Sequence, residues 1–374
     1  MSNPAFNAQA AESQRSGLEK KESRLEEIKD HARRFGRSEG IGVVPAGAPF
    51  PVASVETGYY GIPLLKAPQW KPEVPVYFFV GGAAGAASVI GAIAHLTGRD
   101  QKIAKDARLI AVAGAAISSG LLISDLGRPE RFLNMLRMFK PQSPMSVGAW
   151  VLAGFGTFSG AAATAQILAD HFGFGAFRIL GNVAEGFAAV FGLPFSNYTG
   201  VLIGATTIPV WNHNVGTLPF HFGMSGMNAA ISVLELMGND SSKPLNRIAI
   251  LSSAAEMLEG VKLEMRCDPE INKPLKTGAS GWITRTGGVL SGPVPLALRL
   301  AAEFASQKRS RTLRRIAAGS SIIGSLFTRV GWVKAGSVSA RDWRLTQQEP
   351  PQAVNETPLV NKRPIQIASL SSRR

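Results

Sequence analysis

Length, composition and charge give the first limits on this chain of 374 residues. Its formal net charge of +14 would suggest a nucleic-acid partner in a soluble protein, but no RNA- or DNA-binding motif accompanies it. The single cysteine, Cys267, excludes an intrachain disulfide and a cysteine-ligated iron–sulfur cluster. The average hydropathy is unremarkable because polar ends dilute a dense apolar middle. We therefore interpret the positive charge as loop residues that set membrane topology and contact anionic lipid.

Three regions follow one another along the chain. Residues 1–70 form a polar N-terminal tail, in which apolar residues at helical spacing predict a short amphipathic helix over 17–35. Residues 71–335 form the expected transmembrane domain. Residues 336–374 form a polar C-terminal tail.

The middle region contains eight apolar segments close to the roughly 20 residues that a spanning helix needs. They predict an all-α, polytopic membrane helix bundle with about eight transmembrane helices. The segments are 75–97, 107–124, 146–169, 178–207, 218–237, 246–265, 286–305 and 312–333. Pro194 predicts a kink or a break in the fourth. Glycines and alanines over 81–88 favour close helix packing, since no strand precedes them as a nucleotide-binding motif would require.

The positive charges between these segments predict an orientation. Connectors after the first, third, fifth and seventh segments carry twelve lysines and arginines, and the other connectors carry eight. The richer side is expected to be cytoplasmic. Both termini and the connector between the second and third segments would then face outward.

Charged residues inside the apolar segments are costly and require an explanation: Glu185, Glu256, Glu259 and Arg299. Glu256 and Glu259 are three residues apart and therefore share a helix face. One hypothesis is a proton route through the bundle. The other is a buried pair in which Arg299 neutralises a glutamate.

Three motifs together resemble the polysulfide-reductase membrane-anchor family, of the NrfD/PsrC-like type. They are WKPEVPVYFFVGGAAGA at 70–86, DLGRPERFLNMLRMFKPQSPMSVGAW at 125–150 and SNYTGVLIGATTIPVWN at 196–212. The similarity extends over roughly residues 70–342, and the tails fall outside it.

This resemblance implies a multi-pass subunit of the bacterial inner membrane that holds menaquinone or ubiquinone near one membrane face. It implies a docked four-cluster iron–sulfur partner and a molybdopterin-type catalytic subunit. The chain itself would carry no metal or haem, and would pass electrons between the quinone pool and the partner's nearest cluster. It would have no activity alone.

The quinone head group would need a hydrogen-bonding group for each oxygen and an apolar slot for its ring. The resemblance identifies Tyr198 as the leading donor, because the matching tyrosine in the family lies at the quinone. Glu73 takes a position where better-known members have an amide, and it could relay protons or be a solvated charge at the start of a helix. Val76 and Tyr77 stand where some members have a histidine. Asp125 is a candidate proton acceptor. Alternatively, its carboxylate is braced by Arg128 across the short turn of DLGRP.

Further members of the motifs are candidates for lining the pocket, although each of them could equally be a packing residue. These are Asn197, Tyr77, Arg128, Ser143, Trp150 and Trp211. Tyr198 itself could be an interfacial aromatic, which is common in membrane proteins.

Three other functions remain open from the sequence. A haem-b subunit would need two facing histidines at similar depth, for which His95 and His171 are the only plausible pair. A proton- or ion-translocating subunit would show repeats or broken helices, and Pro194 is the one such feature. A bare membrane anchor would lack a redox site of its own.

Overall fold

The structure, a computed structural model, describes residues 63–98, 100–126, 128–265 and 270–345. Every regular element in these ranges is a helix, which confirms the predicted all-α polytopic bundle. The predicted amphipathic helix over 17–35, Cys267 and residues 346–374 lie outside the described residues.

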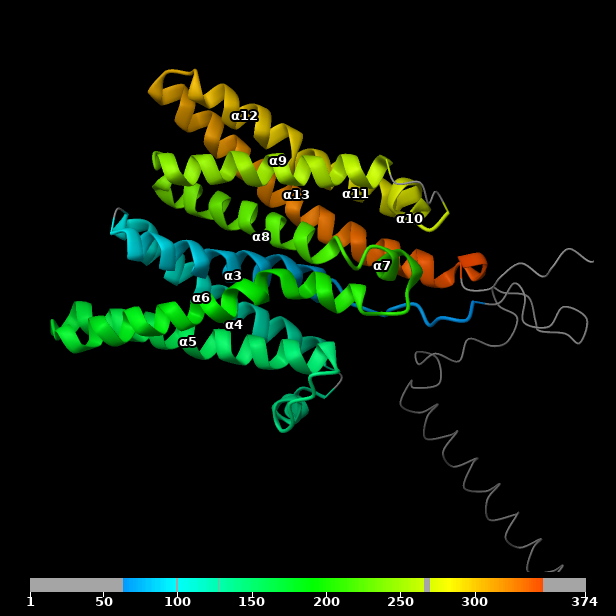
Figure 1. The fold of residues 1–374 in the computed structure, drawn as a ribbon, viewed down its shortest axis with the longest axis horizontal. Coiled ribbons are helices and arrows are strands. Elements are labelled where there is room, and N and C mark those ends of the chain that lie inside the picture. Colours follow the sequence, from blue (N-terminus) through cyan, green and yellow to red (C-terminus); the bar gives the residue numbers. More distant parts are fainter. Residues whose placement is uncertain (1–62, 99, 127, 266–269, 346–374) are drawn as a thin grey trace, which may run out of the picture.

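The first half of the bundle consists of four long helices joined by short connections. They are α3 (Glu73–Thr97), α4 (Gln101–Asp125), α5 (Pro144–Phe172) and α6 (Gly175–Gly204). The connector between α4 and α5 contains the 3-10 helix η1 (Pro129–Leu136), which projects from one end of the bundle in Figure 1. The predicted close packing is present where α3 meets α6. A Cβ at Gly85 would lie 2.8 Å from the backbone nitrogen of Ser196.

In the described part of the second half there are five longer α-helices and two short ones, and the long helices run roughly parallel to those of the first half (Figure 1). The long helices are α8 (Leu218–Leu234), α9 (Lys243–Met265), α11 (Gly278–Ser291), α12 (Pro293–Glu303) and α13 (Gln307–Arg341). The short ones are α7 (Pro209–His213) and α10 (Lys273–Lys276). A π-helical turn, η2 (Glu235–Asn239), continues α8.

Five of the described helices, α3, α4, α5, α6 and α13, are long and apolar enough by length and composition to cross a membrane. The other three predicted segments are helical too, but their helices are not among these five. The helix α8 has 17 residues before its π turn, and α9 carries the predicted glutamates. The segment predicted at 286–305 is divided at Gly292 into α11 and α12. By contrast, α6 runs continuously through Pro194, so no break occurs there.

A buried arginine joins the two halves of the bundle. Arg329 of α13 is fully buried, and its guanidinium donates to the carbonyl oxygens of Phe78 at 3.0 Å and Phe222 at 3.1 Å. It also donates to the Ser225 hydroxyl at 2.7 Å. These acceptors lie on α3 and α8, so one side chain links three helices. Its hydrogen bonds offset part of the cost of burying the charge.

The other charges within the predicted segments are mostly paired. Arg108 contacts Glu185 at 2.6 Å between α4 and α6. Arg299 contacts Glu235 at 3.0 Å, with both side chains essentially buried. Arg299 therefore neutralises a glutamate, as one of the two hypotheses held, but its partner is Glu235, which is not among the glutamates singled out from the sequence.

Candidate functional site

A cavity of about 280 Å³ lies in the first half of the bundle, where α3, α4, α5 and α6 meet the connector helix η1. Its wall is mostly apolar. Tyr77, Asp125 and Tyr198, all predicted site residues, line it. These three residues are far apart in the sequence, and the fold brings them to one space.

Tyr198 is the most informative residue of this wall. Its side chain is buried, and its hydroxyl lies beside the Gly148 backbone without a hydrogen-bond partner in good geometry. A Cβ at Gly148 would overlap the Tyr198 ring, so only glycine lets α5 approach α6 at this level. A buried hydroxyl without a partner is costly, and a ligand oxygen in the cavity would satisfy it.

Tyr77 and Asp125 line the same cavity from other helices, and Glu73 lies on α3 before Tyr77. Tyr77 is buried on α3 and packs against Phe195, with ring centroids 6.3 Å apart. Asp125 is the last residue of α4 and is half-buried at the cavity wall. Glu73 begins α3, one helical turn before Tyr77, and its buried Oε2 atom also has no hydrogen-bond partner. Glu73 does not itself line the cavity.

Asp125 forms no ion pair with Arg128 among the described residues. The Arg128 side chain is exposed on the connector and does not line the cavity. The carboxylate is therefore available to the cavity, and the brace expected across the DLGRP turn is not formed.

Four further predicted residues have packing or capping positions in the structure. Asn197 donates to the Leu193 carbonyl at 2.8 Å and packs against Gly223 of α8. Ser143 is the N-cap of α5 and accepts from the Ser146 backbone nitrogen at 3.4 Å. None of the four lines the cavity.

The remaining two of these four are tryptophans. Trp150 is 40% exposed and contacts Phe139 of the connector edge to face, with ring centroids 6.3 Å apart. Trp211 is fully buried, stacks on Trp70 at 5.1 Å and donates from its indole nitrogen to the Trp332 carbonyl at 2.8 Å. These contacts pack the connector against α5 and join α7 to Trp70 and to α13.

Sequence reasoning missed the residues that cover the cavity. Part of its wall is formed by Phe132, Met135 and Leu136 of η1. None of these three residues was a site candidate from the sequence. Their spacing of three and four residues was the available signal, since it puts them on one face of a helix. Gly148 was also missed, and only the packing against Tyr198 shows why that position carries no side chain.

The described residues contain no group of three or more His, Cys, Asp or Glu side chains that could hold a metal ion. His95 lies in the last turn of α3 and His171 in the last turn of α5. His171 contacts the neighbouring Phe172 ring edge to face.

The helices and the apolar cavity between them define a multi-pass membrane protein with space for an amphiphilic ligand. Comparison with known families gives a more specific result. The family described as polysulfide reductase, of the NrfD type, matches residues 56–339, and the chain belongs to that family. It is thus a membrane subunit of an oxidoreductase. A search of curated proteins finds no match.

Proposed function

We propose that this subunit binds a membrane quinone or quinol in the cavity of about 280 Å³ and passes electrons between it and an iron–sulfur partner. The observation that carries the proposal is the buried, unpartnered hydroxyl of Tyr198 at the wall of an apolar cavity. Ligand sites commonly combine an apolar slot with a few polar groups that orient the ligand. Tyr77 and Asp125 supply further polar groups from α3 and α4.

Each residue has a specific role in this proposal. A quinone supplies two-electron, two-proton redox chemistry when it is bound. The Tyr198 phenol donates a hydrogen bond to one ring oxygen and exchanges a proton with it. The Asp125 carboxylate, at the end of α4, accepts a proton near the surface of the bundle. The apolar residues of η1 exclude water from the ring.

The partner would dock over the end of the bundle that carries η1. Membrane subunits of this family generally partner with iron–sulfur and molybdenum catalytic subunits. The connector exposes Arg131, Arg137 and Lys140 beside the cavity, which suits contact with an acidic protein surface or lipid phosphate. We place this end on the outer face of the bacterial inner membrane, in keeping with the distribution of positive charge.

Filling the cavity tests the proposal directly. Ala153 lines the cavity on α5, and Ala161 of the same helix is exposed. We expect Ala153→Phe to lower the quinone retained by the purified complex by about tenfold, because the new ring occupies the slot. Ala161→Phe is the matched control and should retain the wild-type amount. Equal retention in both variants would place the quinone elsewhere.

A buried hydrogen-bonded series favours proton translocation as a second candidate function. Asn228 donates to the Glu256 carboxylate at 2.9 Å and accepts from Arg299 at 2.8 Å. Arg299 in turn contacts Glu235. The series connects α9, α8 and α12 through the buried part of the second half of the bundle.

Glu256→Gln distinguishes this second function from the first. The amide cannot release a proton, but it preserves the shape of the side chain. If the series carries protons, the variant complex in vesicles should lose proton uptake coupled to turnover while quinone reduction continues. Asn246→Asp, at another buried position of α9, would show whether a change of charge elsewhere in the helix has the same effect. Unchanged proton uptake in Glu256→Gln would rule out the route.

A further inference from the structure

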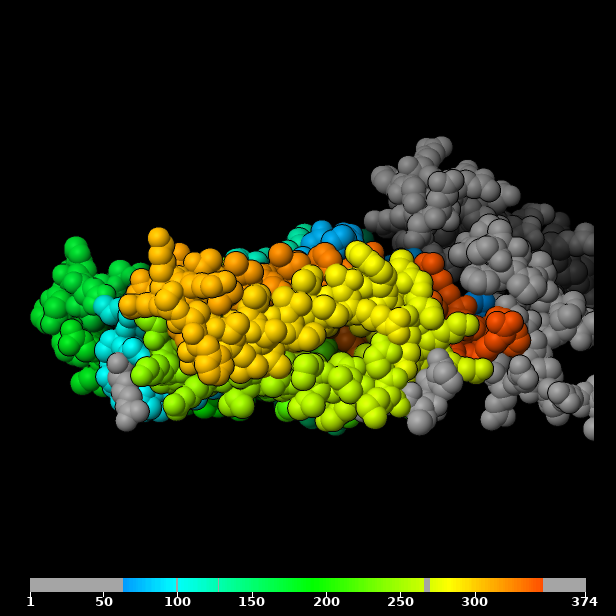
Figure 2. Space-filling view, turned by 90° about the horizontal axis from the view of Figure 1, so that it is seen from above, coloured from blue at the N-terminus to red at the C-terminus, as the bar shows by residue number. Residues whose placement is uncertain are grey.

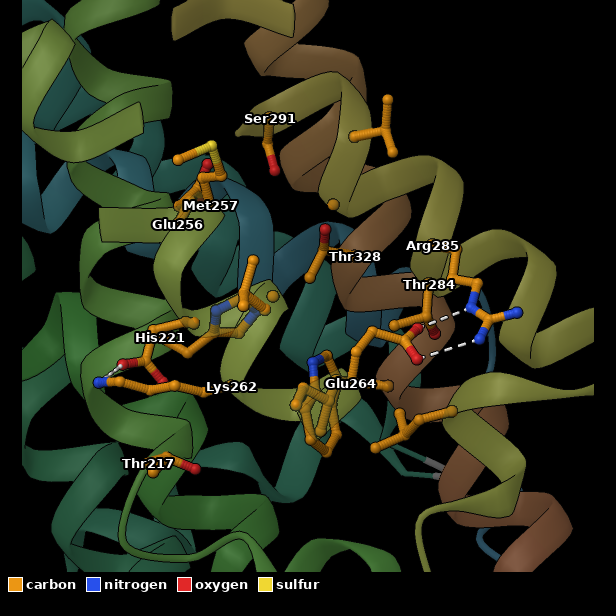
Figure 3. A pocket seen from close by; sticks show the side chains of 18 of the residues that line it. Thr217, His221, Glu256, Met257, Lys262, Glu264, Thr284, Arg285, Ser291 and Thr328 are labelled. Atoms are coloured by element: carbon orange, nitrogen blue, oxygen red, sulfur yellow. Dashed lines mark hydrogen bonds and ion pairs between the residues drawn. The ribbon is translucent and has the colours of Figure 1, made fainter. Parts of the chain in front are cut away.

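A second and larger cavity lies in the other half of the bundle. Its volume is about 440 Å³, and α8, α9, α11 and α13 contribute most of its wall (Figure 3). Two glycines help to leave it empty, because a Cβ at Gly260 or Gly288 would meet no atom within 4 Å. None of the residues that line the first cavity takes part in it.

The cavity opens on the flank of the bundle. Figure 2, which looks onto the side of the helices, shows a hollow between the yellow-green atoms of α9 and the yellow atoms of α11, with the orange of α13 in its depth. The long helices lie parallel to this face, so lipid would surround the opening. A ligand could therefore enter from the membrane, as a lipid-soluble molecule must.

Among the residues that the structure describes, two buried polar atoms at this cavity lack hydrogen-bond partners. Trp332 is 4% exposed, and its indole nitrogen has no acceptor. Glu256 is 3% exposed, and its Oε1 atom has no partner in good geometry, although the hydroxyls of Ser225 and Ser291 lie near the carboxyl group. His221 stands beside the Trp332 ring, with centroids 6.3 Å apart. The wall thus offers one donor and one carboxyl oxygen to a ligand.

The cations of the cavity wall are already paired. Lys262 contacts Glu259 at 2.9 Å, and Arg285 contacts Glu264 at 2.7 Å, the pair drawn at one side of the cavity in Figure 3. A phosphate group would need free cations or several donors. The lining therefore favours a neutral ligand over a phospholipid head group.

We propose that this second cavity binds a neutral amphiphile with carbonyl or hydroxyl oxygens on an apolar ring, namely a second quinone or quinol molecule of the membrane pool. One ring oxygen of the ligand, carbonyl or hydroxyl, accepts from Trp332 Nε1, and in the quinol form the opposite hydroxyl donates to Glu256. The ring and the start of the tail fill the apolar space beside Gly288. This site shares its ligand class with the proposed quinone site and uses none of the residues that line the first cavity.

Photolabelling of the purified complex with a short-tailed azido-naphthoquinone tests the proposal. We expect labelled peptides from two groups of helices, one from α4, α5 and α6 and the other from α9, α11 and α13. Gly288→Leu fills the second cavity and should lower labelling of the second group by about tenfold. Trp332→Phe keeps an aromatic ring, removes the donor and should lower the same labelling. Gly319→Leu is the matched control, because a Cβ there also meets no atom within 4 Å.

The outcomes separate the two sites. Labelling of the first group alone would overturn the second site and leave the proposed function intact. Labelling of the second group alone would overturn the proposed function and support the second site. A third outcome is that native mass spectrometry shows the loss of one bound phospholipid from the Gly288→Leu complex while its quinone labelling is unchanged. In that case the cavity is a lipid site and the proposal is wrong.

Discussion

Replacement of Tyr198 by phenylalanine is expected to lower quinone-linked turnover of the assembled complex by about 100-fold, the lower end of what a positioned proton-transfer group contributes. The ring remains and continues to pack against Gly148, so the fold should be preserved. The phenol alone is removed, and with it the donor that lies at the cavity wall. The loss should appear mainly in kcat, because the apolar slot that binds the ring and tail is unchanged.

Two controls make this result specific. An artificial electron donor that reaches the catalytic partner directly should support the same rate in the variant and the wild type. Thr157→Val removes a hydroxyl from an exposed position of α5 and should leave turnover unchanged. Wild-type quinone-linked turnover in Tyr198→Phe would show that the phenol is not the donor, as in a bare membrane anchor.

The buried pair of Arg299 and Glu235 should give the largest effect on stability. Arg299→Met leaves the Glu235 carboxylate buried without its cation, which is expected to cost about 3–5 kcal/mol. Glu235→Leu should lower the free energy of unfolding by a similar amount, because it leaves the Arg299 guanidinium buried without its carboxylate. The double variant replaces both charges with apolar groups. Its free energy of unfolding should be closer to that of the wild type than the value of either single variant.

Thermal unfolding of the purified complex measures this cycle. The pair of Arg285 and Glu264 is a matched control, since its side chains are 54% and 46% exposed. Arg285→Met should change the unfolding free energy by less than about 1 kcal/mol. Additive losses in the Arg299 and Glu235 variants would show that the two charges do not stabilise one another.

Much of the fold was predictable from hydropathy, because a bilayer requires long apolar helices whose backbone groups are paired internally. All eight predicted segments contain helix. The break at Gly292 was missed, although Gly292 and Pro293 stand together and Pro293 cannot donate a backbone hydrogen bond. At this break the buried Ser291 carbonyl accepts from the Asn228 side chain at 2.9 Å, a contact that only the packed structure reveals. At Pro194 the sequence predicted a kink or a break, but α6 continues through this residue without a break.

The candidate site was predictable in part. The motifs located Tyr198, Tyr77 and Asp125, and all three line one cavity. A motif does not fix the rotation of a helix, so Asn197, one residue from Tyr198, faces α8 instead. Nor does sequence determine which of several glutamates is nearest to Arg299, because that depends on the relative depth of α8, α9 and α12.

The central claim is that the Tyr198 phenol binds a quinone, and an electron cryomicroscopy map of the intact complex with a quinol-analogue inhibitor tests it most directly. We expect the ring of the inhibitor in the cavity between α4, α5 and α6, with one oxygen within hydrogen-bonding distance of Tyr198 Oη. A cavity closed by side chains, or an inhibitor bound away from Tyr198, would contradict the account.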